Sequence, residues 1–313
     1  MEPDRWLGVE LRHLAALQAL AHEGSFGRAA EALGYTQSAI SQQIATLERI
    51  VGEQLVERPG GPRAVSLTEA GELLLRHADS IMARLQAAQA DLAALSSGEA
   101  GTLHIGTYQS VGARILPEVM TRFRASWPAV DIRLRESADD AELLGAVENG
   151  GLDLTFVILP VEPGPFEVTE LLSDPYVLVV AAGSELAERG TPPTMREISK
   201  LPLIGYRQCR SVHAVEERLR ATGASDPNIV FRSDDNGTVQ GLVAAGVGAA
   251  LVPRLSIDAS DEKVAVLELG SKMPPRLIGI AWHRDRYHSP AARAFVETAQ
   301  AVCAPAAELL VVA

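Results

Sequence analysis

The chain has 313 residues, of which 47% are hydrophobic and 4% aromatic, a composition typical of a globular protein with more than one domain. Its two cysteines, Cys209 and Cys303, are far apart and form no CxxC pair, which argues against a disulfide framework or a zinc site. The net charge of −12 argues against nucleic-acid binding through bulk electrostatics, and the lack of a long apolar run or an export signal predicts a cytoplasmic protein with no membrane partner.

Residues 25–51 predict two short helices that meet at a glycine turn, and an amphipathic helix over residues 11–23 precedes them. Ser25 and Thr36 are candidate amino-terminal caps of the two short helices, and Gly34 ends the first of them. The three helices together can enclose a small core.

The second short helix carries an apolar stripe and, on its other side, a polar face. The stripe has spacings of four, three and four residues: Ile40, Ile44, Leu47 and Val51. The polar face consists of short neutral groups: Gln37, Ser38, Ser41 and Gln42. Such groups suit close approach to base edges and phosphates, although two packed helices with an ordinary hydrated side would show the same pattern.

Residues 54–58 and 63–67 predict two short strands around a Pro/Gly tip. A hairpin beside two such helices forms a wing that can follow a DNA groove, and Arg58 and Arg63 flank its tip. Either arginine could instead be an ordinary surface charge. Residues 1–67 hold six basic and eight acidic side chains, so well-placed arginines and multivalency would have to supply the affinity for DNA.

Thr68 is a candidate cap for a long helix over residues 68–97 that carries a heptad seam. The seam positions alternate spacings of four and three residues: Leu74, Ala78, Ile81, Leu85, Ala88, Leu92 and Leu95. A seam of this length predicts pairing with a second copy of the chain, and therefore a dimer on a pseudo-palindromic double-stranded DNA site. A helix buried within one monomer is the alternative.

Beyond this helix the pattern changes to strands that alternate with helices, which predicts parallel sheets covered by helices on both faces. The expected divisions are residues 1–67 for the winged helix-turn-helix, 68–97 for the linker helix, 98–101 for a hinge, 102–304 for an α/β domain and 305–313 for a tail. Within the α/β domain the expected lobes are residues 102–163 with 270–304, and residues 164–269. Two such lobes enclose a cleft in which a ligand can bind against helix amino termini.

Polar residues at the expected helix starts are candidates for contact with a small-molecule effector: Gln109, Ser110, Ser137, Asn236 and Thr238. Amides and hydroxyls at helix starts favour a small anion, and Arg207 could clamp a carboxylate. Arg207 could equally be a surface arginine. Tyr108 and Tyr206 could stack on an aromatic ligand or simply fill core space.

Three segments resemble the LysR-type transcriptional regulator family: FGRAAEALGYTQSAISQQIATLE at 26–48, QLVERPGGPRAVSLTEAG at 54–71 and, less specifically, VAAGVGAALVP at 243–253. The resemblance implies an N-terminal winged helix-turn-helix, a long linker helix and a two-lobed α/β effector domain similar to periplasmic binding proteins. It also implies a homotetramer built from dimers, with a metabolite in the cleft. The DNA-contacting residues implied by the family are Gln37, Ser38, Ser41, Gln42, Arg58 and Arg63. Gln42 departs from the family pattern, because members often have a basic residue there.

Other protein classes fit less well. The sequence has no HExxH, GxSxG or Walker A motif, so we expect no enzyme, no catalytic residue, no metal and no cofactor. A solute-binding or ligand-sensing protein without sequence-specific DNA binding is the alternative function. His283 and His288 are expected in a solvated loop, with a metal pair as the less favoured interpretation. A redox sensor of this family would need a second cysteine near Cys209.

Overall fold

The computed structural model describes residues 5–57, 65–97, 101–189, 191, 193–207, 210–221 and 226–311. The chain forms two compact units, Met1–Gln89 and Ala90–Ala313. Three features predicted from the sequence lie outside the described residues: the wing tip with Arg58 and Arg63, most of the hinge, and Cys209.

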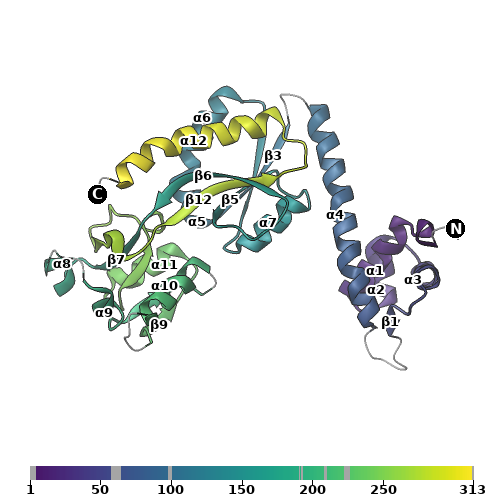
Figure 1. Cartoon of the computed structure of the whole chain (residues 1–313), viewed down its shortest axis with the longest axis horizontal. Coiled ribbons are helices and arrows are strands. Elements are labelled where there is room, and N and C mark those ends of the chain that lie inside the picture. Colours follow the sequence, from purple (N-terminus) through teal and green to yellow (C-terminus); the bar gives the residue numbers. More distant parts are fainter. Residues whose placement is uncertain are drawn as a thin grey trace. The chain divides into compact units, whose positions relative to one another are not determined.

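The first unit contains three helices, a two-stranded hairpin and the beginning of a long helix (Figure 1). Its elements are η1 (Arg5–Gly8), α1 (Leu11–Glu23), α2 (Phe26–Leu33), α3 (Gln37–Val51), β1 (Val56–Glu57), β2 (Ser66–Leu67) and the start of α4 (Glu69–Ser97). Gly34 ends α2 in the left-handed conformation with φ of 71°, as the sequence predicts. The Thr36 side chain caps α3 by accepting a hydrogen bond from the Ala39 N–H. Ser25 stands at the cap position of α2, but its side chain makes no capping hydrogen bond.

Leucines of α1 pack against the apolar stripe of α3 in the core of this unit. The fully buried contributors include Leu17, Leu20, Ile40, Ile44 and Leu47. Burial of each such side chain contributes about 1.5–3 kcal/mol, so the stripe accounts for the stability of this small unit. Val51, the last position of the predicted stripe, is only half-buried.

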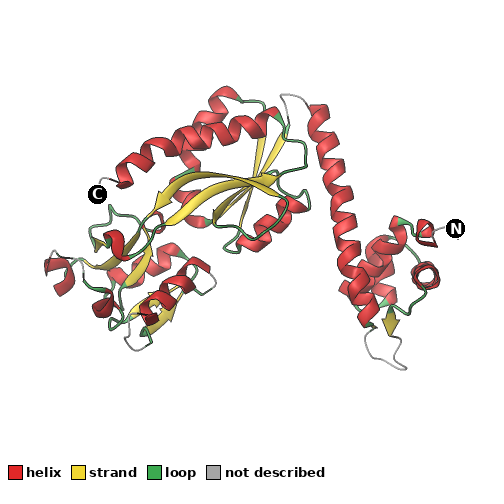
Figure 2. Ribbon diagram, viewed as in Figure 1, coloured by secondary structure: helices red, strands yellow, loops and turns green. Residues whose placement is uncertain are grey.

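The second unit contains the rest of the secondary structure (Figure 2). Its helices are α5 (Gln109–Arg114), α6 (Leu116–Ser126), α7 (Asp140–Glu148), α8 (Glu185–Arg189), α9 (Met195–Ile198), α10 (Arg210–Ala221), α11 (Asn236–Ala244), η2 (Arg254–Ser256), η3 (Gly270–Lys272) and α12 (Pro290–Val311). Its strands are β3 (Thr102–Thr107), β4 (Asp131–Glu136), β5 (Leu154–Leu159), β6 (Phe166–Asp174), β7 (Tyr176–Ala181), β8 (Leu203–Gly205), β9 (Ile229–Arg232), β10 (Ala250–Pro253), β11 (Val264–Glu268) and β12 (Arg276–His283).

The strands form mixed sheets, so the prediction of parallel sheets is only partly right. One sheet has the order β4-β3-β5-β12-β6, and in it β12 runs antiparallel to both β5 and β6. The antiparallel pairing arises because the chain leaves the first lobe along β6 and returns along β12. In the second lobe β7 pairs antiparallel with β10 and β11, while β8 and β9 pair in parallel.

The location of β6 differs from the expected lobe division. Residues Phe166–Asp174 hydrogen-bond along β12 in the first sheet, although the sequence placed them in the second lobe. The chain crosses between the lobes near Pro175, between β6 and β7. The expected tail also differs, because α12 continues through residues 305–311 as helix.

Helices cover both faces of the five-stranded sheet (Figure 2). On one face, α6 and α12 pack together around Phe123 and Phe295, whose rings meet edge to face with centroids 5.3 Å apart. On the other face, α7 packs against β5 and β12. Among the described residues, no helix combines the length and apolarity needed to cross a bilayer.

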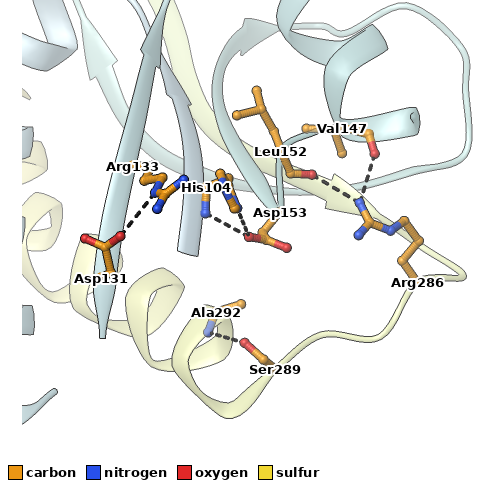
Figure 3. Close-up of polar contacts among 9 residues, drawn as sticks. All are labelled: His104, Asp131, Arg133, Val147, Leu152, Asp153, Arg286, Ser289 and Ala292. Carbon is orange, nitrogen blue, oxygen red and sulfur yellow. Dashed lines mark hydrogen bonds and ion pairs between the residues drawn. The ribbon is translucent and has the colours of Figure 1, made fainter. Parts of the chain in front are cut away.

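Polar contacts tie together the loops at one end of this sheet (Figure 3). The Arg286 guanidinium donates to the carbonyls of Val147 and Leu152, at 3.3 and 3.2 Å, which satisfies backbone oxygens at and beyond the end of α7. The His104 N–H donates to the Asp153 carboxylate at 2.8 Å, and the Ser289 hydroxyl accepts from the Ala292 N–H at the start of α12.

Candidate functional sites

The polar face of α3 is available to solvent in the first unit. Gln37, Ser38 and Gln42 are exposed, and Ser41 is half-buried beside them. The Ser38 hydroxyl lies 3.0 Å from the Thr36 hydroxyl, so the two groups form a hydrogen bond at the start of the helix. Ile40 and Ile44 fix the orientation of this face, because they are fully buried on the opposite side of the helix. These four residues therefore give the first half of the helix a neutral surface of amides and hydroxyls.

The base of the wing is bound to the end of α3 by Glu48. This carboxylate accepts hydrogen bonds from the backbone N–H groups of Leu55 and Val56, at 3.0 and 3.3 Å. Thr68 donates to the Gln54 carbonyl at 2.7 Å and also caps α4 by accepting from the Gly71 N–H. Sequence reasoning overlooked Glu48, because an acid near the end of a helix usually lies in solvent. Its position eight residues before the first wing strand was the available signal.

The heptad seam of α4 is buried at one end and exposed at the other. Leu74 and Ala78 pack into the core of the first unit. Ile81, Leu85 and Leu92 are exposed by 47, 47 and 65% within one chain. Burial inside the monomer, which is the alternative interpretation of the sequence, therefore accounts for Leu74 and Ala78 but not for the three exposed positions.

The second unit contains a cavity of about 640 Å³ between its two lobes. The ends of β3, β4 and β8 and the starts of α5, α7 and α11 meet at this cavity, and the connection between β5 and β6 forms a further wall. Four of the predicted effector residues line it: Gln109, Ser110, Ser137 and Asn236. Thr238 and Arg207 are exposed and are not among its lining residues. Tyr108 and Tyr206 line the cavity and are also largely buried.

Gln109 links the two sides of the cavity. Its amide nitrogen donates to Asp235 and its amide oxygen accepts from the Asn236 N–H, both at 2.8 Å. The hydrogen bond from Gln109 is the main cause that lowers the pKa of Asp235, so this carboxylate is ionised at neutral pH. The Tyr206 hydroxyl donates to the Asn236 side-chain oxygen at 2.5 Å, which completes a network across the cleft.

Arg276, which sequence reasoning missed, lies at the floor of the cavity. Its guanidinium donates to the Asp174 carboxylate and to the Ser110 hydroxyl, both at 2.7 Å, and lies 5.5 Å from the centroid of the Tyr108 ring. Asp174 is completely buried, and this desolvation raises the pKa of its carboxyl group, against the opposing effect of Arg276. No local pattern marks this pair, because its members are 102 residues apart.

The lining of the cavity is rich in carboxylates. Among the described residues it includes Glu136, Asp139, Asp140, Glu148, Glu162, Asp234 and Asp235, with Arg276 as the one basic side chain. The expectation of a small anion depended on amides and hydroxyls at the helix starts, with Arg207 as a possible clamp. The Arg207 backbone N–H donates to Asp234, and its side chain does not line the cavity. An anionic effector therefore remains a prediction that depends on the helix starts.

The sequence predicted a solvated loop for His283 and His288, but both side chains are at least partly buried. His283 is buried, and its ring accepts a hydrogen bond from the Asp285 N–H at 3.1 Å. His288 stacks on Trp282 with ring centroids 5.0 Å apart, and burial lowers the pKa of His288 to about 4. Within the part of the chain that the structure describes, no three His, Cys, Asp or Glu side chains are grouped to hold a metal ion.

Comparison with known families matches nearly the whole chain. Residues 11–72 match the family described as "Bacterial regulatory helix-turn-helix protein, lysR family", and residues 96–304 match "LysR substrate binding domain".

Two relatives are 31% identical to this chain. A "Probable RuBisCO transcriptional regulator" of Cyanophora paradoxa aligns over 93% of this chain and 91% of its own length. The "HTH-type transcriptional regulator AlsR" of Bacillus subtilis aligns over 92% of this chain and 94% of its own length. The crystal structure of full-length CbnR complexed with its target DNA is similar with a TM-score of 0.63 at 20% identity, over 94% of this chain and 100% of CbnR, which shows a shared fold.

Proposed function

The chain belongs to the LysR family of transcriptional regulators, and from that premise we propose that two copies read a pseudo-palindromic operator while a small molecule in the cavity alters the DNA-bound arrangement. The family is one of regulators, so we assign no catalytic residue and no cofactor. The observation that carries the proposal is the neutral polar face of α3, exposed opposite a fully buried stripe.

We assign sequence reading to Gln37, Ser38, Ser41 and Gln42. Amides can form paired hydrogen bonds with adenine, and hydroxyls can donate or accept at either base pair, so this face suits direct readout in the major groove. Its lack of positive charge leaves phosphate contacts to other groups, and from the sequence we assign these to Arg58 and Arg63 of the wing. The Glu48 hydrogen bonds support this assignment, since they hold the wing base against the reading helix.

The dimer contact of this proposal is the exposed part of the α4 seam. Leucines exposed at heptad spacing lose unfavourable contact with water when a second helix covers them. Leu85→Glu should therefore shift the chain toward monomers in sedimentation analysis. Leu73→Glu is the matched control, because Leu73 is exposed on the same helix outside the seam. If both variants sediment as the wild type does, the seam is not the dimer contact. Pairing of such dimers into a tetramer follows from the family resemblance.

The cavity of the second unit is our candidate effector site. Its volume of about 640 Å³ lies in the range of small-molecule pockets. Gln109, Ser110, Ser137 and Asn236 are the predicted residues that we retain as ligand contacts, and Arg276 holds Ser110 in place by a hydrogen bond. Thr238 and Arg207 are not assigned as ligand contacts. Their backbone N–H groups donate to Asp235 and Asp234, which line the cavity.

The reading helix is tested with DNA from upstream of the gene. Gln37→Ala and Ser41→Ala should lower the preference for the operator over unrelated DNA by about 1–3 kcal/mol for each lost base contact. Arg58→Ala should weaken binding to all sequences and reduce the salt dependence by about one counterion. Gln89→Ala, an exposed glutamine on α4, is the control. If the α3 variants keep the wild-type preference, the docking assignment is wrong.

A further inference from the structure

We propose that the effector cavity selects an organic cation with an apolar body, such as an aromatic or aliphatic amine. This inference rests on the proposed function, because it names the chemical class of ligand for the same cavity. The cavity defines the site, while its charged and apolar walls decide which ligand is stable there.

The apolar side chains of the lining indicate that the ligand has an apolar part. Apolar and aromatic side chains line the cavity alongside the acids: Leu144, Ile158, Val161, Phe166, Tyr108 and Tyr206. A cavity with this much apolar surface gains stability when it excludes water around a hydrocarbon or ring. A bare inorganic ion would leave that surface wet, so the ligand is organic.

The charged side chains of the lining indicate the charge of the ligand. Seven carboxylates line the cavity, against one guanidinium. A carboxylate ligand would have to approach this excess of negative charge, whereas an ammonium group would be attracted to it. Attraction of this kind also raises the association rate at low ionic strength.

Two of the three helix starts at the cavity do not offset this charge, because aspartates of the chain already cap α7 and α11. Asp139 accepts a hydrogen bond from the Ala141 N–H at the start of α7, at 2.9 Å. Asp235 accepts from the Thr238 N–H at the start of α11, at 2.6 Å. The partial positive charge at the starts of α7 and α11 therefore faces a carboxylate of the protein. An anionic ligand would compete with that carboxylate.

Arg276 is likewise committed to an internal partner. Its guanidinium contacts the fully buried Asp174, and the two charges compensate each other. An anionic ligand that drew Arg276 away would leave Asp174 ionised without its counter-ion. Arginines just behind the walls are also engaged: Arg232 with Glu216, Arg135 with Glu142, and Arg114 with Asp258.

The test compares matched probes that differ in charge. Isothermal titration calorimetry of the full-length protein would use phenethylamine and tryptamine against hydrocinnamate and indolepropionate. We expect the amines to bind and the carboxylates not to bind. Amine binding should weaken as salt is added, because the attraction is screened.

Variants locate the binding site. Glu136→Gln with Glu148→Gln removes two lining carboxylates and should weaken amine binding about tenfold or more. Glu170→Gln removes an exposed carboxylate of β6 that does not line the cavity, and it should bind amines as the wild type does. Equal thermal unfolding of all three proteins without a probe shows that the variants fold.

Three outcomes overturn the inference. Binding of the carboxylates in preference to the amines would keep the cavity as the effector site but contradict its proposed charge selectivity. Amine binding unchanged in the double variant would place the amine outside this cavity. Failure of both classes to bind would contradict the inference and the effector cavity together, whereas DNA reading by α3 is judged separately by the operator assay.

Discussion

Replacing Arg276 should strongly destabilise the second unit. Arg276→Met leaves the buried Asp174 carboxylate without its counter-ion and the Ser110 hydroxyl without its donor. Loss of one partner of a buried ion pair costs about 3–5 kcal/mol. Asp174 keeps a hydrogen bond from the Leu255 N–H at 3.1 Å, which stabilises the remaining charge in part, so we expect the lower half of that range.

A double variant separates the lost charge pair from lost packing. Arg276→Met with Asp174→Asn removes both charges while an amide oxygen can still accept from Leu255. We expect it to cost less than Arg276→Met alone, because no buried charge is left unpaired. Unfolding by urea, followed by the fluorescence of Trp127 and Trp282 in a Trp6→Phe background, reports on the second unit. A loss of less than about 1 kcal/mol in the free energy of unfolding of Arg276→Met would refute this reasoning. A double variant whose loss equals the sum of the losses of Arg276→Met and Asp174→Asn would refute it as well.

The pH dependence of Arg276→Met gives an independent check. Burial raises the pKa of Asp174, and without Arg276 the group is held further toward its protonated form. The penalty therefore applies in full above the raised pKa of folded Asp174 and shrinks as the pH falls below it toward the ordinary carboxyl pKa of 3.8. The deficit of Arg276→Met relative to wild type should therefore shrink as the pH is lowered from neutral into the acid range. A deficit that grows over this interval would contradict the assigned cause.

Two further predictions concern packing and titration elsewhere in the chain. Gly71→Ala should destabilise the first unit by about 1–3 kcal/mol, because its Cβ would lie 2.1 Å from the Leu55 carbonyl oxygen. A Cβ added at Gly241 has no neighbouring atom within 4 Å, so Gly241→Ala should be neutral or stabilising. Thermal unfolding measures both variants. Wild-type protein should lose thermal stability as the pH falls from 6.5 toward about 4, because unfolded His288 binds a proton in this range and folded His288 does not. His288→Phe keeps a ring on Trp282 and should make this loss smaller. Unchanged stability of Gly71→Ala, or an unaltered pH profile of His288→Phe, would contradict these assignments.

The features that sequence reasoning predicted well are local ones. The stripe of α3, the Gly34 turn and the Thr36 cap depend on residues within a few positions of one another, so helical periodicity and capping chemistry are sufficient. The α4 seam is also local in origin. The burial of its first positions and the exposure of later ones were not predictable, because they depend on how far the core of the first unit extends along α4.

The features that sequence reasoning missed are long-range. The pairing of β6 with β12 and the Arg276–Asp174 ion pair join segments about a hundred residues apart, and no local pattern identifies the partner. Four of the predicted effector residues reach the cavity because helix starts gather at strand ends in α/β lobes. Arg207 misses it, since its backbone bonds to Asp234 while its side chain remains exposed outside the lining.

Sedimentation of the full-length protein with DNA from upstream of its own gene tests the central claim most directly. The account predicts an even number of protomers on each operator and loss of that complex in the Leu85→Glu variant, with Leu73→Glu unaffected. A protein that stays monomeric, or that ignores this DNA while remaining folded, would contradict the account.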